Sequence, residues 1–298
     1  MSDVTARVPT SGQHPPIRLI VNADDFGIST RINEGIIAAH RTGIVTSTSL
    51  MAVGSAFEQA VLSCSSVPTL DVGVHLTLVA EQPLLPGTSS VAGDDGRFPD
   101  SAGAFLRRWL TGSIQLEDVQ AEWSAQIERV LDHGIRVTHL DSHQHVHILP
   151  GLADLSLRLA AHYDIPFVRV PVENLQWDRW PGLHGINRMI GTTALWTSWM
   201  LARLTGTRIT QHQPPRFLGF QDGGRLDDRR LQRMLRALRP GQVYELMCHP
   251  GLRPDEPEVQ RWDYHHEIEL RTLTSPSIHS DITAEGIQLC SFAELANL

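Results

Sequence analysis

Lysine is absent from this 298-residue chain, and all 25 of its basic residues are arginines. An enzyme that forms a Schiff base needs a lysine amine, and a nucleotide-binding P-loop needs a lysine beside the phosphates. Both classes are therefore excluded. The 33 acidic residues bring the formal net charge to −8, so nucleic acid is not an expected partner.

Cysteine is scarce, because only Cys64, Cys248 and Cys290 occur and no two of them form a C-x-x-C pair. Neither a disulfide framework nor a thiolate zinc site is expected, and a cytoplasmic location is favoured. Residues 1–16 contain no apolar segment typical of a secretory signal, and we interpret them as a flexible N-terminal tail.

Long apolar runs are missing as well. The most apolar stretch, residues 186–204, is interrupted by Asn187, Arg188 and Arg203, so no membrane span is predicted. A hydrophobic content of 41% beside 19% charged residues is typical of a soluble globular enzyme with a sizeable core.

Short apolar runs alternate with amphipathic helical patterns over residues 17–298, which is typical of parallel strands joined by helices. The predicted strands cover residues 17–23, 45–53, 71–78, 137–141, 167–170, 243–248 and 287–289, and the clearest helices cover residues 29–43, 116–134, 152–161 and 227–238. This alternation favours a barrel or a doubly wound sheet in one domain, since such barrels commonly use about 250 residues. Two segments near residues 80–100 and 172–217 interrupt it and are interpreted as insertions that form binding loops or lids.

Polar residues gather where predicted strands end, which is where α/β enzymes place their active sites. Asp24 and Asp25 follow the first strand, and two adjacent unpaired carboxylates would be costly in a core. A helix N-cap or an Asx-turn is the alternative for this pair. His75 lies in an apolar strand and, taken alone, is as well explained by packing.

The segment from residue 139 to residue 147 has a histidine or an aspartate at every second position. These residues are His139, Asp141, His143, His145 and His147. All five could project from one side of a strand, and if the strand ends near Asp141 the later histidines spread into the mouth of the site. Neutral imidazole is the commonest metal ligand, whereas nonspecific metal binding by a His-rich tract is the alternative.

A hydrolytic metal site needs about three protein ligands, open positions for water, and groups that accept and donate a proton. Asp24, Asp25, His75 and His143 offer these groups, together with His249 in the Cys-His-Pro-Gly segment after a later strand. The Pro-Gly pair at that point could equally mark a simple turn.

Five motifs occur in order along the chain and together resemble the YdjC/ChbG-type carbohydrate deacetylases. They are N-A-D-D-F-G at residues 22–27, G-V-H-L-T-L at 73–78, H-L-D-S-H-Q-H-V-H at 139–147, R-V-P at 169–171 and E-L-M-C-H-P-G at 245–251. Within that family, the Trp-rich insertion and Q-P-P-R-F-L-G-F at 213–220 look most like the HpnK branch, which is associated with hopanoid biosynthesis.

The resemblance implies a distorted (β/α) barrel related to the NodB-type polysaccharide deacetylases. It implies a metal-dependent hydrolase that removes the acetyl group from an N-acetylated sugar, and the HpnK likeness extends this to a lipid-linked sugar such as a hopanoid glycoside. Carried over by position, Asp24 would be the general base and His249 the general acid. Arg169 would pair with Asp24 and keep it charged and oriented.

By the same resemblance, Asp25, His75 and His143 would hold one divalent metal ion. Two imidazoles and one carboxylate favour Zn²⁺, and the resemblance leaves Mg²⁺ open. Asp141, His145 and His147 are assigned to substrate contact or to support of the ligands, because three protein ligands suffice.

Two other functions remain open at this point. A metal-dependent phosphoesterase also uses Asp and His ligands at strand ends, and a non-catalytic metal-containing protein could bind the sugar without releasing acetate. The insertion carries Trp177, Trp180, Trp196 and Trp199, which suit the core or a homodimer interface as well as peripheral contact with a lipid-linked substrate.

Overall fold

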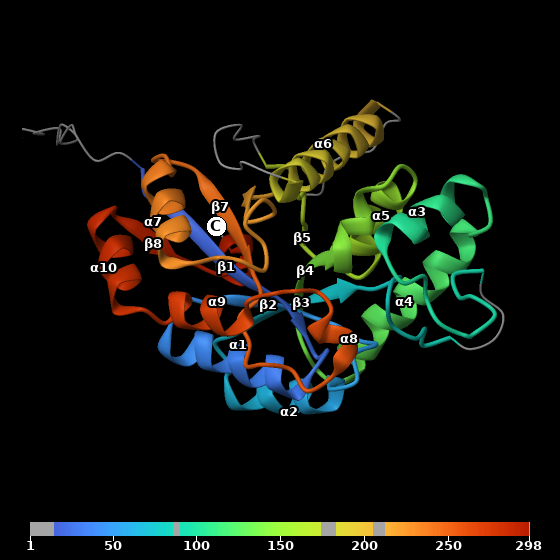
Figure 1. Cartoon of the computed structure of the whole chain (residues 1–298), viewed down its shortest axis with the longest axis horizontal. Helices are drawn as coiled ribbons and strands as arrows, with labels where there is room; N and C mark the ends of the chain where they lie inside the picture. Colours follow the sequence, from blue (N-terminus) through green and yellow to red (C-terminus); the bar gives the residue numbers. More distant parts are fainter. Residues whose placement is uncertain (1–14, 86–89, 174–182, 205–211, 298) are drawn as a thin grey trace, which may run out of the picture.

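The strands of the computed structural model form one parallel sheet that curves into an open barrel (Figure 1). The structure describes residues 15–85, 90–173, 183–204 and 212–297. The sheet order is β5-β4-β3-β2-β1-β7-β6, and β8 pairs with β1 as well. The strands are β1 (Ile17–Phe26), β2 (Ser47–Leu50), β3 (Asp71–Leu76), β4 (Val137–Ser142), β5 (Phe167–Val168), β6 (Arg216–Leu218), β7 (Val243–Cys248) and β8 (Ile287–Leu289).

The helices lie around the outside of this sheet. Helices α1 and α2 cover one side of it, α4 and α5 a second, and α7 and α10 a third, while α6 crosses one end (Figure 1). Their bounds are α1 (Thr30–Thr42), α2 (Phe57–Ser66), α3 (Ala102–Leu110), α4 (Leu116–Asp132), α5 (Leu152–His162), α6 (Leu183–Leu204), α7 (Asp228–Ala237), α8 (Pro257–Gln260), α9 (His266–Leu273), α10 (Pro276–Ala284) and α11 (Phe292–Ala296).

Strand register decides which side chains meet. Ala23 on β1 is opposite Thr48 on β2 and Cys248 on β7, so the residues that follow Ala23 and Cys248 reach the same edge of the sheet. On the next strands, His75 of β3 is opposite Asp141 of β4, and Leu140 is opposite Val168 of β5. The carboxyl ends of β1, β3, β4, β5 and β7 therefore converge at one end of the barrel.

The regular repeat predicted from the sequence is confirmed. Helix α1 begins after Ser29, whose side chain accepts a hydrogen bond from the backbone N–H of Arg31, and α7 begins after Asp227, which caps it in the same way. Strand β2 is shorter than predicted, at four residues. Helices α2, α3, α6 and α8 to α11 and the strand β6 had not been predicted. Most of them are too short to show a clear period, and α6 lies in the segment that was interpreted as an insertion.

The histidine-rich tract is only partly a strand. Strand β4 ends at Ser142, and His143–Ile148 form a 3₁₀ segment in which Gln144 and His145 both have a φ of 56°. Of the two possibilities left open by the sequence, the strand that ends near Asp141 is therefore the one observed, and the five polar residues do not share one side of a strand. His139 and Asp141 alone lie on β4, and the chain turns before the later histidines.

The amino-terminal end of the barrel is closed by apolar residues. Ile20 of β1, Phe167 of β5 and Phe292 of α11 form a buried cluster of their own. The ring of His139 stacks on Phe292 with the centroids 4.1 Å apart. A capping box joins Ser291 and Glu294 at the start of α11, which holds Phe292 in this position.

Both predicted insertions are described in part. Near residue 80, the backbone N–H groups of Leu84 and Leu85 donate to the carboxylate of Glu122 on α4. The second insertion contains α6, and residues 174–182 and 205–211 lie outside the described residues, as do residues 1–14 of the predicted tail. None of the helices described has the length and apolar character needed to cross a membrane.

Candidate metal centre and active site

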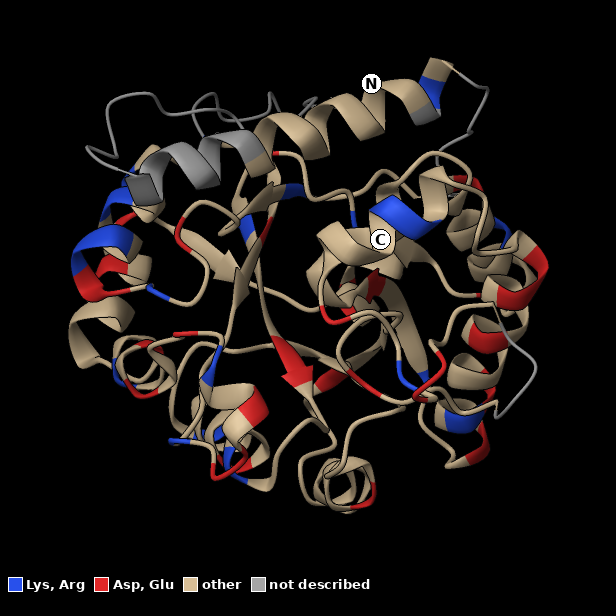
Figure 2. Ribbon diagram, turned by 45° about the vertical axis from the view of Figure 1, so that its right-hand side comes forward, with Lys and Arg blue, Asp and Glu red and all other residues tan. Residues whose placement is uncertain are grey.

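Two adjacent carboxylates lie at the carboxyl end of β1. Asp25 has a left-handed backbone with a φ of 67°, and Gly27 follows with a φ of 97°, so the chain turns sharply toward α1. Strained backbone of this kind in a residue other than glycine concentrates at functional sites. Asp24 and Asp25 are each 2% exposed, so each needs a partner inside the protein. Figure 2 shows acidic residues on a strand at the centre of the ribbon.

Asp25 contacts two imidazoles that come from two other strand ends. Its Oδ1 lies 2.9 Å from Nδ1 of His143 and 3.2 Å from Nε2 of His75. Donor atoms of the three residues all lie within 4.8 Å of one another, close enough to share one ion. The three side chains predicted as ligands are therefore brought together in the structure.

Asp141 orients His75 from behind. Nδ1 of His75 lies 2.8 Å from Oδ1 of Asp141, and because a carboxylate only accepts, Nδ1 carries the proton. Nε2 is then the atom that faces Asp25. Burial lowers the pKa of His75, but the carboxylates of Asp141 and Asp25 outweigh burial and raise it to about 10. The surroundings thus stabilise positive charge at the point where Asp25 and His75 meet, as a metal site requires.

Asp24 is held by a buried arginine. Nη1 and Nη2 of Arg169 lie 2.6 and 2.7 Å from the two oxygens of Asp24, and this two-pronged contact fixes the orientation of the carboxylate. Asn22 donates to the same Asp24 carboxylate from 2.9 Å. The prediction that Arg169 pairs with Asp24 is confirmed by this geometry.

Arg169 also binds Asp141 and Glu245, with contacts of 2.7 and 2.6 Å. Burial raises the pKa of Glu245 to about 7, although Arg169 acts to lower it. With Asp24, three buried carboxylates therefore contact this guanidinium, and the buried carboxylate of Asp25 lies next to them in the chain. Such an excess of buried negative charge is costly unless another cation shares it, which fits a divalent ion beside Asp25.

A second grouping of donors consists of Asp24, His75 and Asp141. Nη1 of Arg169 contacts both of its carboxylates. A metal ion there would lie close to the positive guanidinium, so repulsion makes this grouping the poorer metal site. The grouping around Asp25 has no such contact with Arg169 in the described part of the chain.

His249 follows β7 and approaches the same cluster. Its Nε2 lies 4.0 Å from Oδ2 of Asp25. Burial lowers the pKa of His249 to about 4, even though Asp25 and Asp24 act to raise it, so the ring is neutral at pH 7. Glu269 and His266 position it through the backbone: Glu269 accepts from the N–H of His249 at 2.6 Å, and His266 lies 2.8 Å from its carbonyl oxygen.

His145 and His147 do not reach the Asp25 cluster. Both ring nitrogens of His147 are used inside the protein, on Ser142 at 2.6 Å and on the carbonyl oxygen of Arg169 at 2.9 Å. His145 packs against the rings of Phe217 and Phe220, and its Nδ1 has no hydrogen-bond partner among the described residues. Of the two roles expected for His147, its position therefore favours the supporting one, in which it holds the Arg169 backbone, and not contact with substrate.

Several side chains at the site had not been singled out from the sequence. Ser49 donates to Asp141 from 2.7 Å, Glu245 holds Arg169, Glu269 holds His249, and the ring of Trp262 lies 4.8 Å from that of His143. Glu245 had a signal, because a charged residue in an otherwise apolar strand needs a partner. Ser49 and Trp262 had none, since their neighbours are distant in sequence.

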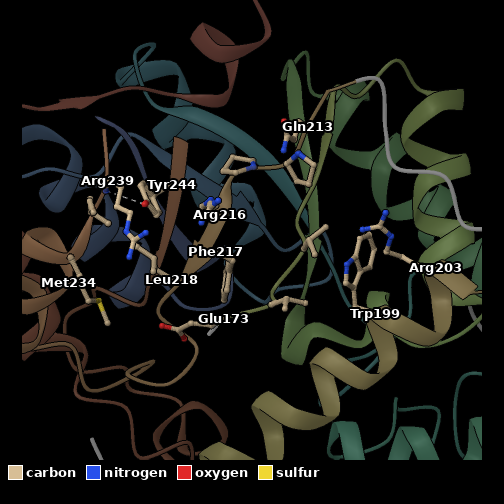
Figure 3. Close-up of a pocket in the computed structure, with 16 residues that line it drawn as sticks. Glu173, Trp199, Arg203, Gln213, Arg216, Phe217, Leu218, Met234, Arg239 and Tyr244 are labelled. Atoms are coloured by element: carbon tan, nitrogen blue, oxygen red, sulfur yellow. Dashed lines mark hydrogen bonds between the residues drawn. The ribbon is translucent and has the colours of Figure 1, made fainter. Parts of the chain in front are cut away.

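The cavity shown in Figure 3, of about 570 Å³, lies outside the Asp25 cluster, between β6, α7 and α6. Trp199 and Arg203 of α6 face Arg216 and Arg239 across it (Figure 3). The ring of Phe217 separates this cavity from the site, 5.4 Å from Cζ of Arg169. Trp196 is 52% exposed, and the remaining two insertion tryptophans, Trp177 and Trp180, lie outside the described residues.

Comparison with known proteins gives one family and several whole-length relatives. A family model described as "YdjC-like protein" matches residues 18–284. The chain is 34% identical over 284 residues to a protein of Brevibacillus brevis, covering 94% of this chain and 100% of that relative. A human protein is 32% identical, with 94% and 92% covered. Both relatives are named carbohydrate deacetylase.

A solved structure is similar over the whole chain. It is that of a candidate cellobiose-phosphate cleavage protein from Enterococcus faecalis, with 27% sequence identity and a TM-score of 0.71. The match covers 94% of this chain and 99% of that one. The arrangement of strands and helices is therefore shared over nearly the full length.

Proposed function

Since the chain belongs to the YdjC-like family, we propose that it is a metal-dependent hydrolase that removes the acetyl group from an N-acetylated sugar. The relatives named carbohydrate deacetylase match it over nearly their whole length. The observation that carries the proposal is the convergence of Asp25, His75 and His143 on one point next to Asp24.

Asp25, His75 and His143 are the residues that would hold the ion. Their two imidazoles and one carboxylate favour Zn²⁺ over Mg²⁺ on ligand softness. When bound, such an ion polarises the amide carbonyl and lowers the pKa of water. Asp141 keeps His75 in the tautomer that directs Nε2 toward Asp25.

We assign to Asp24 the role of accepting a proton from the attacking water. Each of its oxygens accepts from Arg169, yet a carboxylate has about four lone-pair positions, so it retains capacity to accept a proton. Arg169 and Asn22 together occupy three of these positions, so they fix the direction of the one that remains. Asp24 is then the base, and Arg169 acts by positioning it.

We assign to His249 the role of donating a proton to the departing nitrogen. Because its pKa in the free protein is about 4, it must gain a proton during the reaction before it can donate one. Water loses one proton to Asp24 and the amine gains one from His249, so the balance closes when a proton passes from Asp24 to His249 through solvent. Acetate and a free amine are the products.

The test is acetate release from N-acetylglucosamine and its oligomers, with the metal content of the protein measured alongside. Asp24→Asn should lower kcat by about 10³-fold, within the range known for a lost general base, and should leave the metal content unchanged. Asp132→Asn, at an exposed position, is the matched control. Full activity in Asp24→Asn would remove Asp24 from the role of base.

A phosphoesterase would show phosphate release and a second ion per chain, and a sugar-binding protein would bind the oligomers with no acetate formed. Either result would replace the proposal. The apolar side chains Trp196, Met200, Leu201 and Leu204 on α6 are partly exposed, and they favour a lipid-linked sugar, as a hopanoid glycoside would be, as the natural substrate. Equal rates with free and vesicle-bound sugar would defeat that extension.

A further inference from the structure

Three arginines line the cavity of about 570 Å³ between β6, α7 and α6. Arg203 extends from α6, Arg216 from β6 and Arg239 from the segment after α7, and all three are exposed (Figure 3). Within the described part of the chain, none of these guanidinium groups makes an ion pair. Elsewhere on the surface, Arg129 and Arg230 do pair with carboxylates. The arginines of this cavity are therefore available to a ligand.

The charge of the cavity is opposite to that of the whole chain. Glu173 is the one acidic residue among the lining residues that the structure describes, and its carboxylate accepts from the N–H of Gln221 at 3.0 Å. Three arginines beside one glutamate leave an excess of positive charge, although the chain has a formal net charge of −8. Such a local excess attracts anions, and the planar donors of a guanidinium match the oxygens of a phosphate. The cavity therefore suits a phosphate group.

Helix α6 places an apolar strip beside this cavity. Trp199 and Arg203 line the cavity and lie about one helical turn apart. Met200 and Leu204 each follow one of them by a single residue, which is about 100° around the helix, and they are 39% and 78% exposed. Trp196, one turn before Met200, is 52% exposed. These three exposed side chains form the apolar strip, and its neighbours on the cavity side are basic or aromatic.

An apolar strip next to basic groups is typical of a helix that lies in the surface of a lipid bilayer. Its apolar side chains enter the boundary of the acyl chains, and its basic groups stay at the level of the phosphates. Helix α6 runs along the upper edge of the ribbon in Figure 2 and contains no acidic residue. A free phosphate would use the arginines alone, whereas a lipid accounts for the exposed strip as well.

We propose that this cavity binds the phosphate of an anionic lipid headgroup while the apolar strip of α6 enters the bilayer surface. The site is separate from the proposed active site, because Phe217 lines the cavity and its ring lies between the cavity and Arg169. It goes beyond the proposed function and does not depend on acetate release. A chain with a net charge of −8 is repelled as a whole by an anionic surface, so binding to one has to come from this local site.

The double variant Arg216→Gln/Arg239→Gln removes two of the three guanidinium groups. We expect the apparent Kd of the full chain for vesicles of phosphatidylglycerol in phosphatidylcholine, measured by co-sedimentation, to rise about 25-fold, because each arginine near an anionic surface contributes about fivefold. Arg41→Gln is the control, since Arg41 is exposed on α1, on the side of the molecule away from α6 (Figure 1). It should change the Kd less than about twofold. An unchanged Kd in the double variant would overturn the proposal.

Vesicles in which oleate replaces phosphatidylglycerol at equal surface charge separate a phosphate site from general attraction. The wild-type protein should bind the phosphatidylglycerol vesicles more tightly, and Arg216→Gln/Arg239→Gln should lose this preference. Equal binding of the wild-type protein to both kinds of vesicle would overturn the phosphate site.

Met200→Gln/Leu204→Gln tests the apolar strip and keeps the arginines. The Kd for phosphatidylglycerol vesicles should rise about tenfold, because two apolar side chains no longer enter the bilayer, while the preference over oleate vesicles should remain. Leu62→Gln is the control, at a leucine that is 73% exposed on α2, and it should leave the Kd unchanged. An unchanged Kd in Met200→Gln/Leu204→Gln would exclude a lipid as the source of the phosphate.

Inorganic phosphate distinguishes a lipid headgroup from a soluble ligand. Calorimetry without vesicles should show that it binds at least about tenfold more weakly than phosphatidylglycerol vesicles, because it gains nothing from the apolar strip. Equal affinity would overturn the assignment to a lipid.

Acetate release from soluble N-acetylglucosamine oligomers separates this proposal from the proposed function. The rate in Arg216→Gln/Arg239→Gln should equal that of wild type, since neither arginine contacts a proposed catalytic group in the described part of the chain. Vesicle binding without acetate release in the wild-type protein would refute the hydrolase and support the lipid site. Acetate release without a preference for phosphatidylglycerol would refute the lipid site and leave the hydrolase in place.

Discussion

The two ends of the barrel interior shift the pKa values of their buried histidines in opposite directions. At the carboxyl end His75 has its pKa raised to about 10 by Asp141 and Asp25, against the effect of burial. At the amino end His139 is equally inaccessible, and burial lowers its pKa to about 3. Burial alone therefore does not decide the charge of an imidazole, because the number of nearby carboxylates decides it.

Ser49 joins the two ends. Its hydroxyl donates to Asp141 from 2.7 Å, so it can only accept from His139, whose Nε2 lies 3.1 Å away. The ring of His139 stacks on Phe292, while the ring of His75 contacts two carboxylates. The amino end is thus packed like an ordinary protein core. The carboxyl end holds several buried carboxylates with a histidine of raised pKa, and such a cluster is typical of a functional site.

The largest difference between the two ends of the barrel should appear when Arg169 is replaced. Arg169→Met leaves Asp24, Asp141 and Glu245 without their guanidinium, and removal of one partner from a buried ion pair costs about 3–5 kcal/mol. We expect a loss of that size in the free energy of unfolding measured by urea denaturation, together with loss of acetate release. Arg158→Met, which breaks an exposed pair with Asp154, should change the unfolding free energy by less than about 1 kcal/mol.

If Arg169→Met were no less stable than Arg158→Met, the carboxylates at this end would have to be protonated or solvated, and the charged end would resemble the apolar one. The metal content of both variants should be measured as well. Asp25, His75 and His143 do not contact Arg169 in the described part of the chain, so a folded Arg169→Met should still bind the ion.

The fold could be predicted because its signals are local. The apolar runs at residues 17–23, 71–78 and 243–248 and the helix that starts after Ser29 follow from periodicity and capping, and each is present in the structure. Strand order and the open edge between β5 and β6 could not be read in this way, because pairing depends on residues far apart in the chain.

More of the candidate site was predicted than periodicity and capping alone could give, because its residues lie in recognisable motifs. The positions of Asp24, Asp25, His75, His143, Arg169 and His249 came from motifs, and the structure brings them together. The path of the chain after Ser142 was not predictable, since the left-handed pair Gln144 and His145 is favoured by tertiary contacts and not by propensity. Ser49, Trp262 and Glu269 were missed because each acts on a partner that is remote in sequence.

A smaller effect is expected at the amino end, where stability and catalysis should separate. Phe292→Ala removes a fully packed ring that contacts Phe167 and His139, which should cost about 3 kcal/mol in the free energy of unfolding. Acetate release at 25 °C should stay within about twofold of wild type, because no proposed catalytic group contacts Phe292. Leu110→Ala is the control, at a side chain that is 76% exposed. A large fall in kcat for folded Phe292→Ala would show that the two ends are coupled.

The effect that is smallest at neutral pH concerns the proton that buried His139 does not take up in the folded protein. His139 stays neutral in the folded protein down to about pH 3, whereas in the unfolded chain its pKa is about 6.5. The unfolded state therefore binds one more proton between these values, so this side chain makes the protein less stable as the pH falls from about 6.5 toward 3. The slope is about 1.4 kcal/mol per pH unit.

His139→Gln removes that titration and keeps an N–H that can donate to Ser49. At pH 7.5 the variant should lose about 1 kcal/mol through poorer packing on Phe292, and its unfolding free energy should fall less steeply than that of wild type between about pH 6 and 4. His162→Gln, at an exposed histidine, should keep the wild-type slope. Equal slopes in all three proteins would mean that His139 takes up a proton without unfolding, and the neutral amino end would then differ from the charged end far less than its burial implies.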